Sequence, residues 1–413
     1  MSDVVNSKPF KFFGGVVLAG VGIVTGQPWL IYAGASMWAS GVAEGLREWN
    51  ASPTAAEREQ GRMVNVLSNE ASMPVVYGRT KLGVQIFDVR LHATNPNFLY
   101  VVAGIALGSE DGSGIEDVDE IYFDERLAIS NPDFESEPST TGVQSAFSGK
   151  LSYGLHRGAD AQAVDAELDS VFSQYDADTV GRGVAYLVLK LTYDPDVYPT
   201  GIPNITAVVK GQRVWDPRGT PAWTYSDSPA LCILDYLTSK RYGAGVLYSE
   251  RDGGSVSEID QQSFIDAANY HDDVITMGPG TGTRFTVNGR LDTGKSIATN
   301  LAELLSSCRS ELVYEGGKFR LSTPQVVTAE TFELNADNII GEVEYWRGGT
   351  EEVPNRVICH FIDDVNEWLP QEVAWPEANQ ANGFLTADND FENVLEIALP
   401  YTVGHYRAQQ IGM

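Results

Sequence analysis

The chain has 413 residues, and 56 acidic residues against 28 lysines and arginines give it a formal net charge of −28. Such a surface repels nucleic acid, because DNA- and RNA-binding proteins use Lys and Arg to neutralise phosphates, so a nucleic-acid-binding protein is excluded. A hydrophobic fraction of 43% and 41 glycines indicate a globular, turn-rich protein, long enough for two or three domains.

Cysteine and histidine are too sparse to form a recognisable site. Cys232, Cys308 and Cys359 are too few and too far apart for a disulfide framework or a paired-cysteine metal site. The five histidines are scattered along the chain and none forms a pair at metal-ligand spacing. We therefore expect buried free thiols, no metal, no cofactor, and no catalytic triad that uses these residues.

Residues 1–65 are expected to form an apolar N-terminal helical segment. Residues 12–43 carry no charge, and Pro28 divides them into two apolar runs. The first run is shorter than the roughly 20 residues that a membrane-spanning helix needs, which favours a helical hairpin buried in protein over a membrane-inserting segment. The residues that would form this plug or membrane segment are Phe12, Phe13, Gly22, Gly26, Trp29 and Trp38.

Residues 66–212 are predicted to form a β-rich domain. Runs such as LGVQIFDVRL, FLYVVAGIALG and GVAYLVLKLTYD are rich in β-branched and aromatic residues and end at Gly, Pro, Asn or Asp. Since helices do not separate most of these runs, we expect an antiparallel sheet or barrel. One helical insertion is predicted near residues 159–176, where apolar side chains recur at helical spacing.

Residues 213–345 are predicted to be a mixed α/β domain. A helix should begin at Pro229, and SEIDQQSFIDAANYHDD and SIATNLAELLSSC should form two more. LVYEGGKFRLST predicts a hairpin that turns on Gly316 and Gly317. Residues 346–413 return to strands and end in GHYRAQQIGM, a helix start without a stop signal, so we expect homologues or the natural protein to continue past Met413.

The stretch GRLDTGKS, Gly289–Ser296, fits the phosphate-binding loop pattern of nucleotide hydrolases. Such a loop needs a buried parallel strand before it and a helix whose N–H groups hold the phosphates after it. The preceding RFTVN is short and alternating, and its neighbours carry hairpin signals instead. We interpret the stretch as a strand-to-helix turn in which Asp292 and Thr293 cap a helix that begins near Gly294.

The segment from Glu110 to Glu137 is strongly acidic. It contains eleven acidic residues and one basic residue, Arg126. A solvated loop region is the simplest interpretation. Acidic side chains could also line a channel through which DNA passes without binding.

The segment WDPRGTPAWTYSDSPALCILDYLTSKRYGAGV resembles the central tail tip, or tail hub, proteins of lambda-like long-tailed bacteriophages, also called host-specificity proteins. An aromatic-Asp pair, Ser-x-Pro-Ala, Leu-x-Asp-x-Leu-Thr and Tyr-Gly-x-Gly carry the resemblance. The order of strand, turn, helix and hairpin from RFTVNG to LSTPQ is similar as well. The structural positions matched are Trp215, Asp216, Pro229, Asp235, Tyr242, Gly243 and Gly245.

The resemblance covers residues 200–413 well and PVVYGR and DEIYFDE more loosely. It implies an α+β, mainly β fold of several domains, with tube-like antiparallel β-barrels and a helix-containing α/β domain. The apolar N-terminal helical segment lies outside the pattern and is expected from its composition alone. The resemblance further implies a structural virion protein at the tail tip, the site of host attachment. That protein would assemble in the host cytoplasm into a homotrimer that closes the tail tube and opens for DNA ejection.

The partners implied are tail tube or distal ring (baseplate) proteins, the tape measure protein, transiting DNA by repulsion, and transiently a membrane. In this family the matched positions serve packing, helix starts and turns, so no catalytic residue is implied. Three alternatives stay open: a nucleotide hydrolase that uses Gly289–Ser296, a carboxylate-based wall-degrading hydrolase, and a membrane-inserting pore built on residues 12–43.

Overall fold

The computed structural model describes residues 66–67, 72–134, 138–199, 201–324, 353–377, 383–388 and 391–413. Contacts within the chain define two compact units. The first unit comprises Met1–Asp227, Ser239–Gly245 and Asn288–Asn300; the second comprises Ser228–Thr238, Val246–Val287 and Leu301–Met413. The six segments alternate along the chain. The division into residues 1–65, 66–212, 213–345 and 346–413 stays a prediction.

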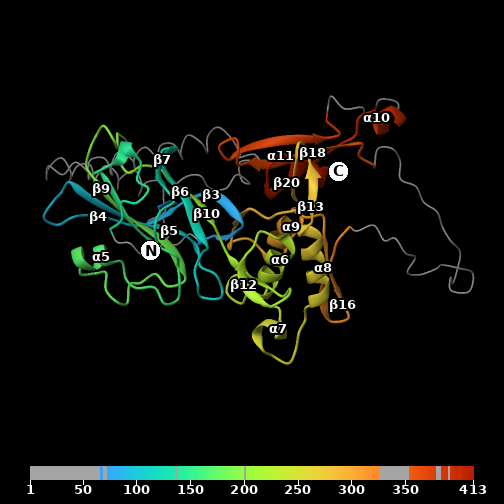
Figure 1. The fold of residues 1–413 in the computed structure, drawn as a ribbon, viewed down its shortest axis with the longest axis horizontal. Coiled ribbons are helices and arrows are strands. Elements are labelled where there is room, and N and C mark those ends of the chain that lie inside the picture. Colours follow the sequence, from blue (N-terminus) through green and yellow to red (C-terminus); the bar gives the residue numbers. More distant parts are fainter. Residues whose placement is uncertain are drawn as a thin grey trace, which may run out of the picture. The chain divides into compact units, whose positions relative to one another are not determined.

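Two sheets form the body of the first unit (Figure 1). The five-stranded sheet has the order β1-β4-β5-β9-β8 and consists of β1 (Val66–Leu67), β4 (Gln85–Leu91), β5 (Phe98–Leu107), β8 (Leu151–His156) and β9 (Val184–Thr192). The four-stranded sheet has the order β3-β10-β6-β7 and consists of β3 (Arg79–Gly83), β6 (Asp117–Phe123), β7 (Arg126–Ser130) and β10 (Ile205–Lys210). All neighbours are antiparallel except β1 and β4.

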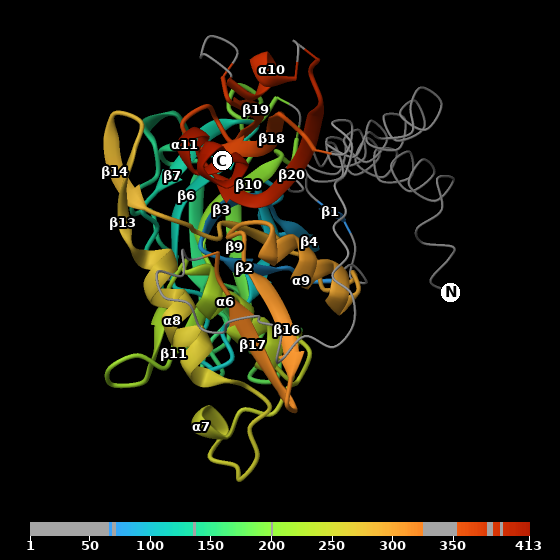
Figure 2. The ribbon, with the colours of Figure 1, turned by 90° about the vertical axis from the view of Figure 1, so that its right-hand side faces the viewer.

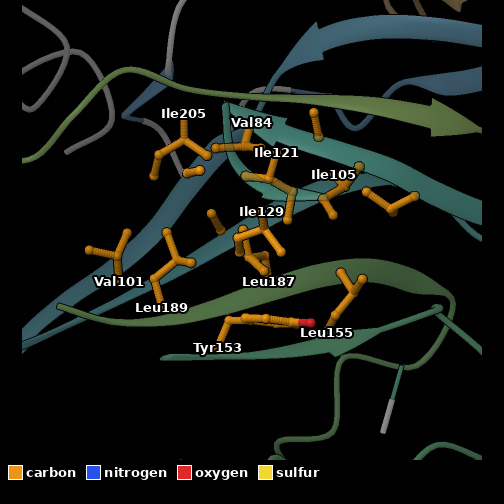
Figure 3. Packing of buried hydrophobic residues seen from close by; sticks show 14 of the residues in the cluster. Val84, Val101, Ile105, Ile121, Ile129, Tyr153, Leu155, Leu187, Leu189 and Ile205 are labelled. Atoms are coloured by element: carbon orange, nitrogen blue, oxygen red, sulfur yellow. The ribbon is translucent and has the colours of Figure 1, made fainter. Parts of the chain in front are cut away.

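The apolar core of this unit lies between the two sheets (Figure 3). Val101 and Leu189 from the five-stranded sheet pack in one cluster with Ile121 and Ile205 from the four-stranded sheet, and all four are fully buried. The two sheets therefore form a sandwich, as expected when each sheet has one apolar face to bury. The mainly β class predicted from the sequence is confirmed.

The predicted barrel does not close in the described residues. The chain turns from β3 into β4 at Val84, but no ladder joins β7 to β8. The intervening segment lies along both edges instead: isolated bridges link Ile129 to Val143 and Ser139 to Tyr153. Because this segment satisfies the edge backbone groups, the two sheets stay separate.

The outer face of the five-stranded sheet is covered as well. Helix α5 (Ala166–Val171) contributes Leu168, which packs with Tyr100, Tyr186 and Val188 in a second cluster. Burial on both faces explains why β5 and β9 are continuous apolar runs rather than alternating ones. The helix is shorter than the predicted 159–176, because Asp165 caps its start by accepting a 2.8 Å hydrogen bond from the Leu168 N–H.

Smaller elements complete the first unit. They are the 3-10 turn η1 (Ser145–Phe147), the antiparallel pair β2 (Val75–Tyr77) and β15 (Gly289–Leu291), and the hairpin β11 (Arg213–Asp216) and β12 (Ala222–Tyr225).

The second unit contains most of the helices. They are α6 (Pro229–Thr238), α7 (Ser249–Asp252), α8 (Gln261–Asp272), α10 (Gly383–Ala387) and α11 (His405–Gly412), and α9 (Ile297–Leu305) crosses into this unit at Leu301. The helices predicted after Ser228 and in SEIDQQSFIDAANYHDD and SIATNLAELLSSC are thereby confirmed. Helix α6 packs against α8.

Two hairpins and a three-stranded sheet make up the rest of the second unit as far as its residues are described (Figure 2). The hairpins are β13 (Val274–Met277) with β14 (Gly280–Thr283), and β16 (Glu311–Glu315) with β17 (Lys318–Ser322). The sheet has the order β19-β18-β20 and consists of β18 (Arg356–Asp363), β19 (Leu369–Trp375) and β20 (Val394–Val403). The predicted turn at Gly316 and Gly317 is confirmed, since both have positive φ, 59° and 83°.

Candidate functional site

The aromatic-Asp motif forms one corner of the β11–β12 hairpin. Trp215 pairs with Trp223 across the two strands, and their rings meet edge to face with centroids 5.9 Å apart. The Asp216 carboxylate accepts hydrogen bonds from the Arg218 backbone N–H at 2.9 Å and from Arg218 Nη2 at 2.8 Å. The pair is thus a turn stabilised by local side-chain bonding, which is a structural role.

The Pro-Ala and Leu-x-Asp motifs lie on α6, whose ten residues are all buried. Pro229 is the first helical residue, where its missing N–H costs nothing. Asp235 is only 1% exposed, and Thr238 Oγ1 donates a 2.8 Å hydrogen bond to the Leu234 carbonyl. A helix buried all round is a core element, so the residues of this motif serve packing.

The Tyr-Gly-x-Gly motif forms the exit from α6. Gly245 has a positive φ of 68°, and its N–H donates to the Ser239 carbonyl at 3.0 Å. Gly243 is not among the residues with positive φ, so the requirement for glycine in the turn falls on Gly245. Tyr242 is 9% exposed, and its N–H donates to Ser239 Oγ at 3.3 Å.

Sequence reasoning missed Arg241, which lies within this exit segment. Its Nη1 donates a 3.2 Å hydrogen bond to the Gly108 carbonyl, and its Nη2 donates to the Gly183 carbonyl. The neighbouring Lys240 N–H donates to the Glu110 carboxylate at 3.1 Å. The guanidinium thus ties residues 239–245 to two loops of the first unit. A basic pair directly before Tyr-Gly-x-Gly is the signal that could have indicated this contact.

The loops around Arg241 form what we call the loop junction, made of residues 108–116, 157–162, 180–183, 211–213 and 240–241. Gln212 Nε2 donates to the Leu107 carbonyl at 2.7 Å, and Gln162 Nε2 donates to the Val180 carbonyl at 2.8 Å. Ser109 Oγ donates to the Gly114 carbonyl at 2.6 Å. Side chains here satisfy backbone carbonyls, which holds the loops in place.

Glycine is required at several places in the loop junction, and two of them show the reason. A Cβ on Gly114, whose φ is 86°, would lie 2.3 Å from the Arg157 carbonyl oxygen. A Cβ on Gly211 would lie 1.9 Å from the carbonyl oxygen of Val76. Since backbone atoms cannot move aside cheaply, the loops approach each other at distances that only glycine permits.

The GRLDTGKS stretch adopts a geometry unlike that of a phosphate-binding loop. Strand β15 pairs with β2 in an antiparallel ladder instead of standing in a parallel sheet. Helix α9 begins at Ile297, and Ser296 is its capping residue: Ser296 Oγ accepts from the Thr299 N–H at 3.2 Å. The prediction that Asp292 and Thr293 cap the helix is wrong.

Those two residues fix the turn instead. Asp292 Oδ1 accepts from the Gly294 N–H at 2.8 Å, and its carbonyl accepts from Asn300 Nδ2 at 3.0 Å. Thr293 Oγ1 donates to the Met73 carbonyl at 3.3 Å. The interpretation as a strand-to-helix turn is confirmed, because the helix start is closed by the chain's own side chains.

The acidic segment 110–137 is partly neutralised by basic residues of the same unit. Asp119 lies 2.7 Å from Arg79 Nε and 2.9 Å from Lys210 Nζ, and Glu125 lies 2.8 Å from the Nζ of Lys81. Burial by itself would raise the pKa of Asp119, but the hydrogen bonds from Arg79 and Lys210 outweigh it and hold that pKa below its usual value. These carboxylates stabilise the sheet edge and are poor candidates for a channel lining.

The remaining candidates are a metal site and a membrane segment. Among the described residues, no cluster of three or more His, Cys, Asp or Glu side chains could hold a metal ion. In the same part of the chain no helix has the length and apolar character needed to cross a membrane. The candidate plug or membrane residues, Phe12, Phe13, Gly22, Gly26, Trp29 and Trp38, lie outside the described residues.

Comparison with known proteins identifies relatives among phage particles. No protein-family model matches the chain. Over 392 residues the chain is 24% identical to the baseplate hub protein pb3 of Escherichia phage T5, a match that covers 82% of this chain and 40% of the phage protein. The chain therefore spans less than half the length of that relative.

A solved structure supports the same assignment at the level of fold. A chain in the virion of a native gene transfer agent particle matches with a TM-score of 0.53 and 15% identity, over 90% of this chain and 82% of that one. Together the two similarities confirm the resemblance to phage tail hub proteins. The sequence match also covers a larger share of the chain than residues 200–413, to which the motifs had confined it.

Proposed function

We propose that this chain, a relative of the phage tail hub proteins, is a structural virion protein whose homotrimer closes the distal end of a tail tube. The observation that carries the proposal is the similarity to a baseplate hub protein over 82% of the chain. The described residues agree with it, since their motif positions serve packing and turns and their loop junction is built for rigidity. In this proposal the trimer sits at the tail tip and opens for DNA ejection.

The partners follow from that position. The tail tube or a distal ring contacts the hub on one side, and the tape measure protein ends on it. The β-sandwich of each copy takes the place of a tube-like domain, so that three copies continue the wall of the tube. Assembly takes place in the host cytoplasm, and residues 12–43 plug the trimer or contact a membrane during ejection.

The charge of the chain suits a conduit for DNA. At about 0.15 M salt the Debye length is about 8 Å, so acidic walls repel a duplex only at close range, which is enough to keep it from binding. We infer that acidic side chains outnumber basic ones on the inner surface of the ring. The ion pairs of Asp119 and Glu125 remove these two from the candidates for that lining.

Native mass spectrometry of the full chain, alone and mixed with the tail tube protein, tests the proposal. We expect a trimer bound to a tube ring. Gold-labelled antibodies should then mark the end of the tail in intact particles. The hub assignment would be refuted if the chain stayed monomeric both alone and with the tube protein. Antibody labelling of the capsid would refute it as well.

Deletion of residues 12–43 tests the plug. Because a long uncharged run would be an aggregation hazard if exposed, we expect the deletion to cause premature release of tail contents or loss of solubility. Stable particles of normal infectivity would contradict this role.

A further inference from the structure

The β13–β14 hairpin is an exposed ribbon without charges. Val274 is 72% exposed, and Thr276 and Thr281 are also exposed. No acidic or basic residue occurs between Val274 and Thr283, although one residue in five of the whole chain is charged. In Figure 2 the ribbon runs away from the end of α8. The hairpin thus presents a β-branched, uncharged row to its surroundings.

The pairing within this ribbon is weak. Cross-strand partners share a face of a hairpin, and Ile275 and Met277 both face glycines, Gly282 and Gly280. Half of the cross-strand pairs therefore lack one side chain. Within its own chain the ribbon contacts α11, where a Cβ on Gly278 would clash with the Tyr406 ring. A two-stranded ribbon with so little support is marginally stable in water, and glycine within a strand often marks a place where another backbone approaches closely. A Cβ on Gly280 would meet nothing within 4 Å.

Other exposed strands of the second unit contain residues that disfavour pairing with a strand of another chain. The β16–β17 hairpin has Glu311, Glu315, Lys318 and Arg320 along its strands, and Arg320 Nε lies 3.0 Å from the Asp260 carboxylate. In the three-stranded sheet each outer strand contains a proline, Pro370 in β19 and Pro400 in β20. Charge and proline are the usual means by which edge strands avoid association. Neither occurs within the two strands of the β13–β14 ribbon.

The charge of the chain indicates which partner suits this ribbon. Two copies carry −28 each and repel one another wherever charged surfaces meet. A basic protein would be recognised by acidic side chains, and DNA by basic ones, but the ribbon has neither. An uncharged β-branched row is the surface that a second, equally acidic copy can approach without an electrostatic penalty.

We propose that the β13–β14 ribbon is the arm by which one copy of this chain holds the next copy in the hub. The proposal rests on the trimeric hub proposed above and names the surface that closes it. In a ring of identical copies, each arm contacts a different surface of its neighbour, which is the heterologous contact that a closed ring requires. The arm is a pairing surface and needs no change in the rest of the fold.

Two variants of the full chain test the arm. Val274→Glu with Thr281→Glu places two negative charges on the exposed row, where they would face an equally acidic copy, and Val313→Glu on the 40%-exposed Val313 of β16 is the matched control. We expect the double variant to lose the trimer in native mass spectrometry while its circular dichroism stays unchanged. The control should remain trimeric.

A photo-reactive benzoylphenylalanine at position 274 identifies the partner directly. Crosslinking in assembled particles should join two copies of this chain; crosslinks only to another tail protein would overturn the proposal. A double Glu variant that stays trimeric would also overturn the arm, while leaving the trimeric hub intact. If the wild-type chain never forms a trimer, even with the tube protein, both the proposed hub and the proposed arm are refuted.

Discussion

Helix α6 in the second unit and the loop junction in the first are both held by many contacts, but by different physical means. Around α6 the contacts are apolar: Leu231, Ile233 and Leu234 are at most 1% exposed. In the loop junction the contacts are polar, and Arg241, Gln162 and Gln212 donate to backbone carbonyls. This difference predicts which substitution should lower the free energy of unfolding most, since opening an apolar cavity costs more than losing one partly exposed hydrogen bond.

The largest loss of stability is expected from a substitution in α6, the apolar region. Leu234→Ala removes a fully buried side chain, so we expect the free energy of unfolding to fall by about 2–5 kcal/mol. Leu247→Ala is the matched control, because Leu247 belongs to the same unit but is 46% exposed. Urea denaturation followed by circular dichroism measures both. Equal losses for the two variants would contradict the role of α6 as a core element.

The difference between the two regions also explains how much the sequence could predict. The start of α6 follows from Pro229 and the polar residues before it, and its burial follows from ALCILDYL, because local signals determine both. The loop junction depends on contacts between residues more than 50 positions apart, such as Arg241 with Gly183 and Gly108. The basic pair before Tyr-Gly-x-Gly marks Arg241 as unusual, but no local pattern names the distant carbonyls to which it donates.

The same limit applies to the strands. The positions of β5 and β9 were visible as apolar runs, and an antiparallel sheet or barrel was expected; two antiparallel sheets form a sandwich instead of a closed barrel. The segment between β7 and β8 pairs with both strands only through the bridges from Ile129 to Val143 and from Ser139 to Tyr153. Strand pairing of this kind depends on how a connecting segment lies against the edges, which alternation of apolar residues cannot show.

The second prediction concerns His271, a buried polar residue of the second unit. His271 is fully buried on α8, and its Nε2 lies 3.0 Å from Ser310 Oγ. Burial, assisted by the nearby positive charge of Arg284, lowers the pKa of His271 from 6.5 to about 3. The folded state therefore holds the imidazole neutral over a pH range in which the unfolded state binds a proton.

The sign of the pH dependence follows from linkage. Above pH 6.5 neither state is protonated and His271 has no effect on stability; as pH falls from 6.5 towards 3, stability is lost by up to roughly 1.4 kcal/mol per pH unit. Carboxylates with lowered pKa, such as Asp119, lose their contribution only below their unfolded pKa near 4. Between pH 6.5 and about 4.5, His271→Gln should therefore flatten the measured slope. An unchanged slope would contradict a buried neutral imidazole.

The third prediction tests the polar contacts of the loop junction. Arg241→Ala removes two hydrogen bonds to carbonyls, but the residue is partly exposed and water can replace its donors. We expect a loss of about 1 kcal/mol, and faster hydrogen exchange of the Gly108 amide, which donates to the Gly183 carbonyl. Arg182→Ala, at a neighbouring exposed position, is the control. A loss as large as that of Leu234→Ala would remove the distinction between the two regions.

The smallest effect is expected at Lys295, which belongs to neither region. In a nucleotide hydrolase this lysine would contact phosphates, and its loss would abolish binding. Here it follows a strand that is antiparallel to β2, in a turn fixed by Asp292 and ahead of a helix capped by Ser296. Lys295→Ala should therefore leave the free energy of unfolding and trimer assembly unchanged. Isothermal titration with ATP and GTP provides the decisive measurement, because tight binding by the wild-type chain that disappears in the variant would restore the enzyme interpretation.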